Sequence, residues 1–141
     1  MNDHETAQRC AETMLARDVS TPALGIRIDV TEAGKASARM RVRDDMVNGH
    51  DVCHGGLVFT LADTAFAFAC NTYDRVTVAA GATIEFVRPA RAGDELVATA
   101  HEVHRGRRSG YYDVRVVNQH DELVALFRGR SVARDEPILG T

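Results

Sequence analysis

The sequence predicts an α+β fold in which a curved, mostly antiparallel sheet of about six strands wraps around one long buried helix. Three patterns predict it: a long segment that is apolar on nearly every side, an early hairpin, and later strand-like stretches separated by turn residues. With 141 residues, 45% of them hydrophobic and 26% charged, the chain has the composition of one globular domain over residues 1–141.

The first elements are a short helix and a hairpin. Residues 5–17 carry apolar side chains at spacings of three and four, which predicts an amphipathic helix that ends before Pro22. Residues 24–31 and 35–42 alternate apolar and polar side chains on either side of a turn that contains Gly34. These two stretches therefore predict a β-hairpin.

A polar, glycine-containing loop over residues 43–56 leads into the long helix, expected at about residues 56–72. Its alanine-rich composition favours a helix over a strand, and a helix that is apolar all round must be buried on all sides. Four strands are then predicted near residues 76–87, 94–105, 109–119 and 122–133. Such a sheet leaves an edge strand, which pairing with a second copy would cover.

Composition narrows the possible partners and surroundings. The formal net charge of −3 argues against bulk nucleic-acid binding, which normally needs a basic excess. The start of the chain lacks the basic-then-apolar order of a secretory signal, and no 18-residue stretch is free of polar groups, so we expect a cytoplasmic protein without membrane spans. The three cysteines, an odd number without a paired framework, are expected to be reduced.

Asp63 lies in the middle of the long apolar helix, where an unpartnered carboxylate costs several kcal/mol or has its pKa raised. It either accepts hydrogen bonds from Thr60 or Thr64 or faces a groove, or else it lines an active site as nucleophile or general base. Just before the helix stands His54-Gly55-Gly56, where glycines allow close backbone approach to a ligand. The free N–H groups of the first helical turn suit the developing oxyanion of a thioester carbonyl.

Helix geometry separates these two candidate groups. Gly55 and Asp63 are eight residues apart, or roughly 12 Å of helical rise. Groups that act on one carbonyl must each lie about 3 Å from it, and the lean of the Asp63 side chain recovers only a few ångström. If both act on one thioester, Asp63 meets the His54-Gly55 turn of another subunit, which predicts an active site at a dimer interface.

The chain resembles the hotdog-fold acyl-CoA thioesterases of the phenylacetate-degradation (PaaI) type from about residue 24 to 132. The resemblance rests on the runs Asn48-Gly49-His50, Cys53-His54-Gly55-Gly56, Leu61-Ala62-Asp63-Thr64-Ala65-Phe66-Ala67, Thr83-Ile84-Glu85-Phe86-Val87-Arg88-Pro89 and Ala125-Leu126-Phe127-Arg128-Gly129. It implies a hotdog fold, a homotetramer built from dimers, and hydrolysis of aryl- or hydroxyphenylacetyl-CoA to the acid and CoA without a metal. No cofactor is implied, since coenzyme A is part of the substrate.

The resemblance also assigns roles by position. Gly55 polarises the thioester carbonyl through its N–H, Asp63 acts from the facing subunit, and His54 and Asn48 orient the site. Some relatives have Asn near the position of Arg17, where it is thought to help position groups at the site, and the arginine here leaves that auxiliary role open. Further candidates for binding the substrate are Gly56, Thr64 and the arginines that suit the phosphates of CoA, namely Arg88, Arg105, Arg107 and Arg108.

Several alternatives stay open at this point. A metal hydrolase would need His50, Cys53, His54 and Asp63 to converge, and a cysteine enzyme would need Cys53 to face His54. An enoyl-CoA hydratase or a non-catalytic acyl-CoA sensor on the same fold are the others. The preferred acyl group is not encoded in a motif, and the pocket candidates are Phe59, Phe66, Met46 and Tyr73. Whether Asp63 attacks directly or activates water is also open.

Overall fold

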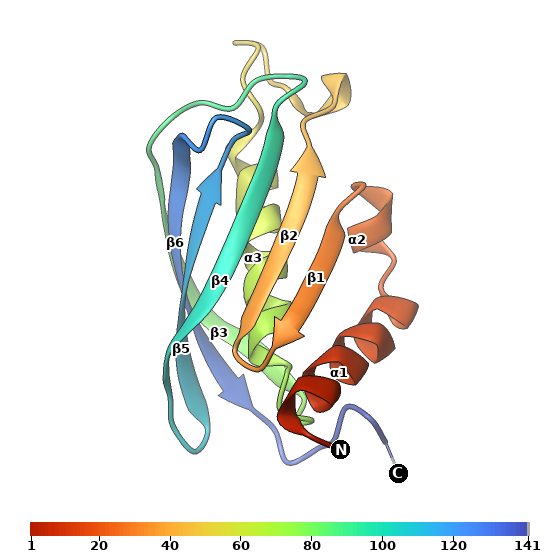
Figure 1. Ribbon diagram of the computed structural model, residues 1–141. Coiled ribbons are helices and arrows are strands. Elements are labelled where there is room, and N and C mark those ends of the chain that lie inside the picture. The colour runs from red at the N-terminus through yellow and green to blue at the C-terminus, as the bar shows by residue number, and fades with distance from the viewer. Residues whose placement is uncertain (141) are drawn as a thin grey trace.

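The computed structural model describes residues 1–140, which form one antiparallel six-stranded sheet with the strand order β1-β2-β4-β5-β6-β3 (Figure 1). The strands are β1 (Arg27–Glu32), β2 (Lys35–Arg41), β3 (Thr77–Phe86), β4 (Glu95–Arg105), β5 (Ser109–Val117) and β6 (Leu123–Ala133). The hairpin and the four later strands agree with the sequence prediction to within three residues at each end. Every strand pair is antiparallel.

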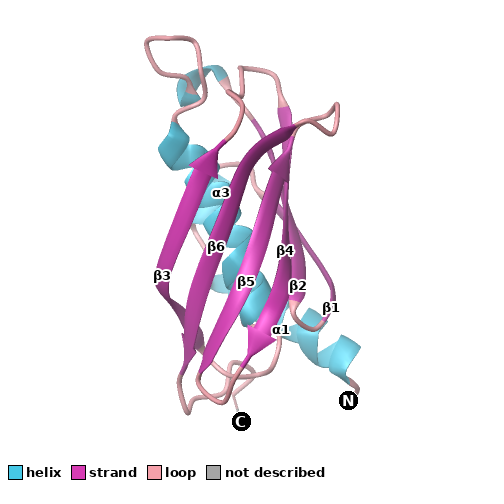
Figure 2. Ribbon diagram, turned by 90° about the vertical axis from the view of Figure 1, so that its left-hand side faces the viewer, coloured by secondary structure: helices cyan, strands magenta, loops and turns pink. Residues whose placement is uncertain are grey.

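One face of the sheet curves around the long helix α3 (Gly55–Cys70), as Figure 2 shows from the side. Leu61, Ala62 and Ala65 are fully buried between this helix and the strands. Small alanine side chains let the helix approach the sheet closely, while Phe66 fills the space between it and Tyr112, with ring centroids 5.6 Å apart. The predicted hotdog arrangement is confirmed.

The N-terminal region differs from the prediction in two places. Helix α1 (Asp3–Arg17) begins two residues earlier than predicted, because the Asn2 side chain accepts a hydrogen bond from the Glu5 N–H at 2.8 Å and caps it. Residues 24–26 are not strand. A short helix, α2 (Ser20–Ala23), is followed by Gly25 at φ +70°, a left-handed turn that an alternation pattern does not reveal.

The loop predicted over residues 43–56 is ordered by backbone hydrogen bonds. It contains the 3₁₀ helix η1 (Asp44–Met46) and then folds back, so that the His54 N–H donates to the Met46 carbonyl at 2.8 Å. The Cys53 N–H donates to the Ala90 carbonyl at 2.7 Å. These bonds fix the start of α3 beside the segment that follows β3.

The expectation that α3 is buried on all sides is wrong for the single chain. Gly56 is exposed, and Thr60, Asp63, Thr64 and Ala67 are only half-buried. Their spacing of three and four residues places them on one stripe of the helix. The sheet covers the other sides, and this stripe carries the carboxylate.

The edge strand β3 is open along its length, and eight of its ten residues are exposed. It contains no proline and no lysine, the residues that commonly block pairing between edge strands. At the other edge, α1 packs beside β1 (Figure 1). None of the helices within residues 1–140 combines the length and the apolarity required to cross a bilayer.

Candidate active site

The first turn of α3 presents one unused backbone donor. His54 is the N-cap residue, and its Nδ1 atom accepts a hydrogen bond from the Gly56 N–H at 2.9 Å. The Leu57 and Val58 N–H groups both donate to the His54 carbonyl, at 2.9 and 3.4 Å. Within residues 1–140 the Gly55 N–H has no acceptor, so it is free to bind a ligand at the positive end of the helix dipole.

Asn48 stabilises the loop that precedes the first turn of α3. Its Oδ1 atom accepts hydrogen bonds from the N–H groups of His50 at 2.9 Å and Val52 at 3.3 Å. Its backbone N–H donates to the Val52 carbonyl at 2.9 Å. Asn48 therefore closes the tight turn before Cys53, and it also lines the groove next to this turn.

A groove of about 310 Å³ opens beside the free Gly55 N–H. Its walls are mostly apolar, and the lining includes Asn48, Gly55, Val58, Phe86, Arg88 and Val124. The Phe86 ring lies against the glycine, since a Cβ added at Gly55 would sit 3.1 Å from the Phe86 Cζ atom. A glycine is therefore required there for close packing, and the groove suits an apolar chain whose polar end reaches Gly55.

None of the four residues predicted to line the acyl pocket lines this groove. Phe66 and Met46 are core residues with 1% and 2% exposure. Phe59 is half-buried and packs edge-on against Phe127, with ring centroids 5.3 Å apart. Tyr73 lies beyond the other end of α3. These four residues therefore belong to the core or to the far end of the molecule.

Asp63 lies half-buried on the open stripe of α3, and burial raises the pKa of its carboxyl above the ordinary 3.8. Thr60 and Thr64, the two candidates for donating a hydrogen bond to this carboxylate, donate to backbone carbonyls instead. The Thr60 hydroxyl donates to the Gly56 carbonyl at 2.8 Å, and the Thr64 hydroxyl donates to the Thr60 carbonyl at 2.6 Å. No side chain within residues 1–140 donates to Asp63, and the groove beside Gly55 does not include it.

The remaining predicted positions have simpler surroundings. The Gly56 N–H is occupied by His54, and a Cβ at Gly56 would meet the His54 Nδ1 atom at 3.0 Å. The glycine thus permits the His54 cap. Thr64 lies on the open stripe next to Asp63. Arg17 lines a separate pocket of about 250 Å³ with Asn71 and Ile138, at the end of the molecule away from Gly55.

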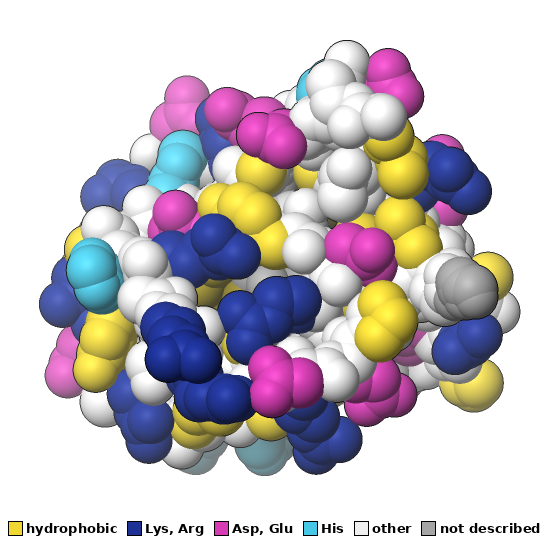
Figure 3. Space-filling model, turned by 90° about the horizontal axis from the view of Figure 1, so that it is seen from below, with side chains coloured by type: hydrophobic (Ala, Val, Ile, Leu, Met, Phe, Trp, Pro, Cys, Tyr) yellow, Lys and Arg dark blue, Asp and Glu magenta, His cyan; other side chains and the backbone are white. Residues whose placement is uncertain are grey.

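The four predicted arginines do not form one patch in the single chain. Arg88 lines the groove and pairs with Glu122 at 3.1 Å. Arg105, Arg107 and Arg108 lie in and beside the β4–β5 turn, at the opposite end of the sheet from the start of α3 (Figures 1 and 2). Seen from that end, basic side chains gather over one area (Figure 3).

The geometry also bears on two alternative enzyme classes, a metal hydrolase and a cysteine enzyme. Within residues 1–140, no three His, Cys, Asp or Glu side chains are arranged to hold a metal ion, so the ligand set of a metal hydrolase is not assembled in the chain. The Cys53 thiol donates to the His54 carbonyl at 3.7 Å and not to the imidazole, and burial raises its pKa. Cys10, Cys53 and Cys70 are free thiols.

The sequence analysis did not identify two residues that line pockets in the structure, Phe86 and Arg75. Phe86 was seen only as part of a motif, although an aromatic residue at the end of a strand, two residues before Arg88, could have indicated a groove wall. Arg75 stands alone in sequence and joins Arg105 and Arg108 only through folding. Its neighbourhood carries no sequence signal, because its partners are 30 to 33 residues away.

Comparisons with known proteins show the family to which the chain belongs. The thioesterase superfamily model matches residues 50–125. The chain is 50% identical over 121 residues to acyl-coenzyme A thioesterase PaaI of Escherichia coli K12, a match that covers 86% of each protein. The structure of the E. coli PaaI protein from the phenylacetic acid degradation operon has a TM-score of 0.94 and 45% identity, over 96% of this chain and 99% of that one.

A more distant neighbour from Streptococcus mutans was solved bound to acetyl CoA. It has 25% identity and a TM-score of 0.76, and the match covers 79% of this chain and 90% of that one.

Proposed function

Because the chain belongs to the thioesterase superfamily, we propose that it is an acyl-CoA thioesterase acting on (hydroxy)phenylacetyl-CoA or a related aryl or medium-chain acyl-CoA. The reaction adds one water across the thioester: the acyl carbon gains the hydroxyl, the C–S bond breaks, and the sulfur gains the proton. The products are the free acid and CoA. In this proposal no metal ion takes part, and CoA enters only as part of the substrate.

The observation that carries the proposal is the unpaired Gly55 N–H at the mouth of an apolar groove. A thioester carbonyl oxygen bound there becomes an oxyanion in the transition state, where a fixed N–H and the helix dipole stabilise it most. Losing one such donor typically lowers kcat on the order of a hundredfold. The apolar walls suit an aryl or alkyl group next to the carbonyl.

Asp63 supplies the second half of the chemistry, as nucleophile or as the base that activates water. No side chain among residues 1–140 donates to its carboxylate, which lies on the uncovered stripe of α3. It is roughly 12 Å along the helix from Gly55. We therefore assign Asp63 to the groove of a second copy, where it meets the Gly55 turn of its mate.

The open edge of β3 supports a dimer that would bring these groups together. Antiparallel pairing of two β3 strands across a two-fold axis extends the sheet and covers the exposed edge. It also sets the two α3 helices side by side in opposite directions, with their open stripes facing. Two such dimers make the homotetramer that the family resemblance implies.

His54 and Asn48 act as positioning residues in this scheme. His54 holds the first turn of α3 through Gly56, so that Gly55 is left as the free donor. Asn48 holds the preceding turn through its Oδ1 atom and lines the same groove, where its NH₂ group is a donor for the substrate in this scheme. Loss of either side chain would move the oxyanion donor without removing it.

The experiment is a panel of aryl, short, medium and long acyl-CoAs, with release of the CoA thiol measured for wild type and Asp63→Ala. We expect Asp63→Ala to lower kcat at least about a hundredfold. Asp29→Ala, an exposed carboxylate on β1, is the matched control and should keep wild-type turnover. Unchanged CoA release by Asp63→Ala overturns the proposal, as does thioester binding without turnover or hydration of enoyl-CoA.

Mixed dimers test whether the Asp63 carboxylate and the Gly55 N–H of one active site come from different chains. Equal amounts of Asp63→Ala and Gly55→Pro chains, after verified subunit exchange, should regain about one quarter of wild-type activity, since half of the dimers carry one intact site. No recovery would show that both groups act within one chain. Single turnover in oxygen-18 water then separates the two roles of Asp63, because early label in its side chain means direct attack.

A further inference from the structure

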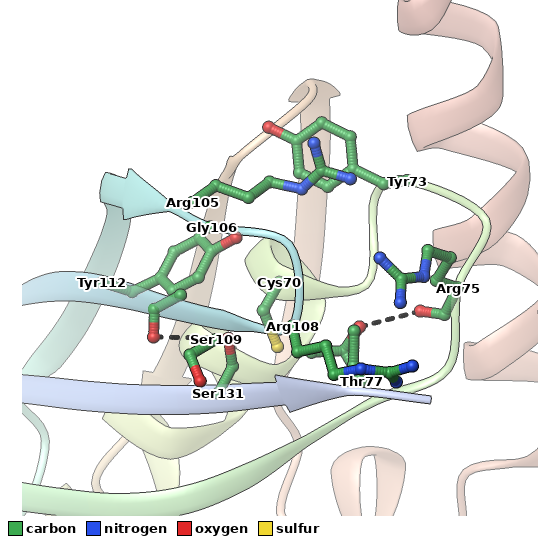
Figure 4. A pocket seen from close by; sticks show the side chains of 12 residues that line it. Cys70, Tyr73, Arg75, Thr77, Arg105, Gly106, Arg108, Ser109, Tyr112 and Ser131 are labelled. Atoms are coloured by element: carbon green, nitrogen blue, oxygen red, sulfur yellow. Dashed lines mark hydrogen bonds between the residues drawn. The ribbon is translucent and has the colours of Figure 1, made fainter. Parts of the chain in front are cut away.

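Arg88 is the one charged side chain among the described residues that line the groove beside Gly55. Arg105 and Arg108 line a separate pocket at the opposite end of the sheet (Figure 4). Apart from Asn48 and the Gly55 backbone, the walls of the groove are mostly apolar. A few polar groups in an apolar pocket fix the orientation of a ligand and decide which ligands fit. The proposed hydrolysis assigns no step to Arg88, so its charge calls for another role.

Arg88 lies a short way along the groove from the oxyanion donor. The Phe86 ring lies against the first turn of α3, since a Cβ at Gly55 would sit 3.1 Å from the Phe86 Cζ atom. Arg88 follows two residues later, at most roughly 7 Å further along the backbone. The N–H groups of Val87 and Arg88 both donate to the Val124 carbonyl, at 2.8 and 3.2 Å, which fixes this segment against β6. An acyl group that fills the groove from the Gly55 N–H therefore extends toward the Arg88 side chain.

Glu122 balances the charge of Arg88. Its Oε2 atom lies 3.1 Å from the Arg88 Nη1 atom, and its Oε1 atom accepts a hydrogen bond from the Asn118 side chain at 3.0 Å. Asn118 is 7% exposed, and its Oδ1 atom accepts from the His120 and Glu122 N–H groups at 2.9 and 3.1 Å. The turn before β6 thus holds the carboxylate beside Arg88 before any substrate binds, which lowers the entropy lost on binding.

The pair offers both kinds of hydrogen-bonding group to a ligand, because a guanidinium only donates and a carboxylate only accepts. The contact joins Arg88 Nη1 to Glu122 Oε2 and leaves other N–H groups and lone pairs of the two side chains open. A hydroxyl accepts from Arg88 and donates to Glu122 at the same time. A carboxylate is attracted by one charge and repelled by the other, and an unsubstituted ring uses neither. The pair therefore fits a hydroxyl.

We propose that Arg88 and Glu122 bind a hydroxyl group at the far end of the acyl group, and so make the protein selective for hydroxylated aryl thioesters. This inference rests on the proposed function, and it names the residues that decide between acyl groups which that function leaves open. Since 48% and 41% of the two side chains are exposed, water replaces part of any hydrogen bond that a substrate lacks. The expected selectivity is about tenfold in kcat/KM.

The first test compares hydroxylated and unsubstituted substrates. Wild type should hydrolyse para- or meta-hydroxyphenylacetyl-CoA with a kcat/KM about tenfold above that of phenylacetyl-CoA. Arg88→Gln should lower this ratio to about two or less, because the charged donor is gone. Arg91→Ala, which removes an exposed arginine outside the groove, is the matched control and should keep the wild-type ratio. Equal values of wild type for the esters, or an unchanged ratio in Arg88→Gln, overturn the inference.

Glu122→Gln tests the acceptor by changing the charge of the site. The variant keeps an oxygen for Asn118 but leaves the positive charge of Arg88 unbalanced. It should lose most of the preference for the hydroxyl. It should also hydrolyse para-carboxyphenylacetyl-CoA about tenfold better than wild type does, because the repulsion by the Glu122 carboxylate is removed. A variant that keeps the wild-type order of these substrates would contradict the role of Glu122.

Pantetheine thioesters separate hydroxyl recognition from phosphate binding by Arg88. They lack the nucleotide of CoA, so the hydroxyl preference of wild type and its loss in Arg88→Gln should be the same as with CoA esters. If Arg88→Gln loses activity on CoA esters alone, the arginine binds a phosphate and the inference fails.

A binding measurement separates this inference from the proposed function. Ketone analogues of the two esters, with a CH₂ group between the carbonyl and the sulfur, bind without turnover and are titrated by calorimetry. Wild type should bind the hydroxylated analogue more tightly, and Arg88→Gln should remove most of the difference. If this pattern appears but no thioester is hydrolysed, the function fails and the hydroxyl site stands. If thioesters are hydrolysed but wild type binds both analogues equally, the hydroxyl site alone fails.

Mixed dimers show which chain supplies the pair. In dimers of Asp63→Ala with Gly55→Pro chains, the one working site of the proposed arrangement takes its Gly55 N–H from the Asp63→Ala chain. Adding Arg88→Gln to that chain should remove the hydroxyl preference, whereas adding it to the Gly55→Pro chain should leave the preference intact. The reverse pattern would place Arg88 in the other site and overturn the assignment.

Discussion

At the scale of one residue, Asp63 occupies a position that costs stability and that suits its proposed catalytic role. Its carboxyl lies on a helix of Leu, Ala and Phe, where burial raises its pKa and no side chain within residues 1–140 donates to it. A base or nucleophile benefits from such weak solvation, because its charge is not already satisfied by hydrogen bonds. The cost falls on the folded state, which holds the charged form less readily than the unfolded chain does.

The pH dependence of stability tests this cost. A carboxyl whose pKa is raised on folding stabilises the fold below its unfolded pKa, and that contribution is lost as pH rises through the raised value. Asp63→Asn removes the titrating group. As pH rises through this window, the free energy of unfolding of Asp63→Asn should therefore increase relative to that of wild type, and above the window the difference should stay constant. Urea unfolding at fixed protein concentration, from roughly pH 3 to 8, measures the difference.

Asp113→Asn is the comparison variant, because the Asp113 carboxyl should contribute to the pH dependence of stability with the opposite sign. The hydrogen bond and charge of Arg128 hold the Asp113 pKa below its usual range, so its contribution is present above the unfolded pKa and lost as pH falls. A difference between wild type and Asp63→Asn that does not change with pH would contradict the assigned burial of this carboxyl.

Gly55 and Phe86 form a second test at this scale. Gly55→Ala keeps the N–H but places a methyl group 3.1 Å from the Phe86 Cζ atom. The ring must move, and we expect kcat/KM to fall about tenfold. Phe86→Ala in the same chain should recover part of that loss, since it removes the colliding ring. Kinetics of the four variants in a double-mutant cycle measure this coupling, and purely additive losses would contradict it.

At the scale of elements, the sequence was sufficient to predict α3 and most of the sheet. The apolar run before Cys70 and the alternation in the later strands predicted α3 and the sheet, because burial dictates both patterns. The start of β1 and the helix α2 could not be predicted from the sequence, because they depend on the left-handed conformation of Gly25. The stripe around Asp63 was also missed, because apolar content alone does not say which face of a helix the rest of the chain covers.

Gly129 shows how β6 and α3 fit together. A Cβ at this position would lie 2.7 Å from the Phe66 ring, which is 1% exposed and has no free space to move into. Gly129→Ala should therefore lower the free energy of unfolding by about 1–3 kcal/mol. Gly49→Ala, where nothing lies within 4 Å of the added carbon, should be close to neutral. Urea unfolding decides, and equal stability of the two variants would contradict the packing argument.

At the scale of the whole molecule, the sequence predicted a divided site from distance alone, since eight residues of helix cannot bring Asp63 to Gly55. The structure adds an open β3 and an uncovered stripe on α3 that fit this expectation. It separates Arg88 from the β4–β5 turn, which spacing along the chain could not reveal. Which arginines lie near one another depends on the strand order and, in the proposed dimer, on the second chain.

The proposed interface is tested by a charge on β3. Thr83 is exposed on this edge, near the level expected for the two-fold axis, so Thr83→Asp sets two like charges close together. We expect weaker dimerisation and a matching loss of activity, with light scattering after gel filtration and turnover measured together. Thr31→Asp makes the same change on β1 and should keep the assembly intact. Full dimerisation of Thr83→Asp would argue against pairing through β3.

The uncovered stripe of α3 has a consequence for how such a protein becomes active in a cell. In the proposed mechanism, a newly synthesised protomer carries both a donor and a carboxylate that cannot reach the same bond, so we expect the lone chain not to hydrolyse thioesters. On this proposal, we expect hydrolysis to begin only when the protein is concentrated enough to dimerise, and the specific activity to fall on dilution. A chain with a damaged carboxylate still lends its donor to a healthy companion, so one defective copy halves the output of a pair and does not abolish it.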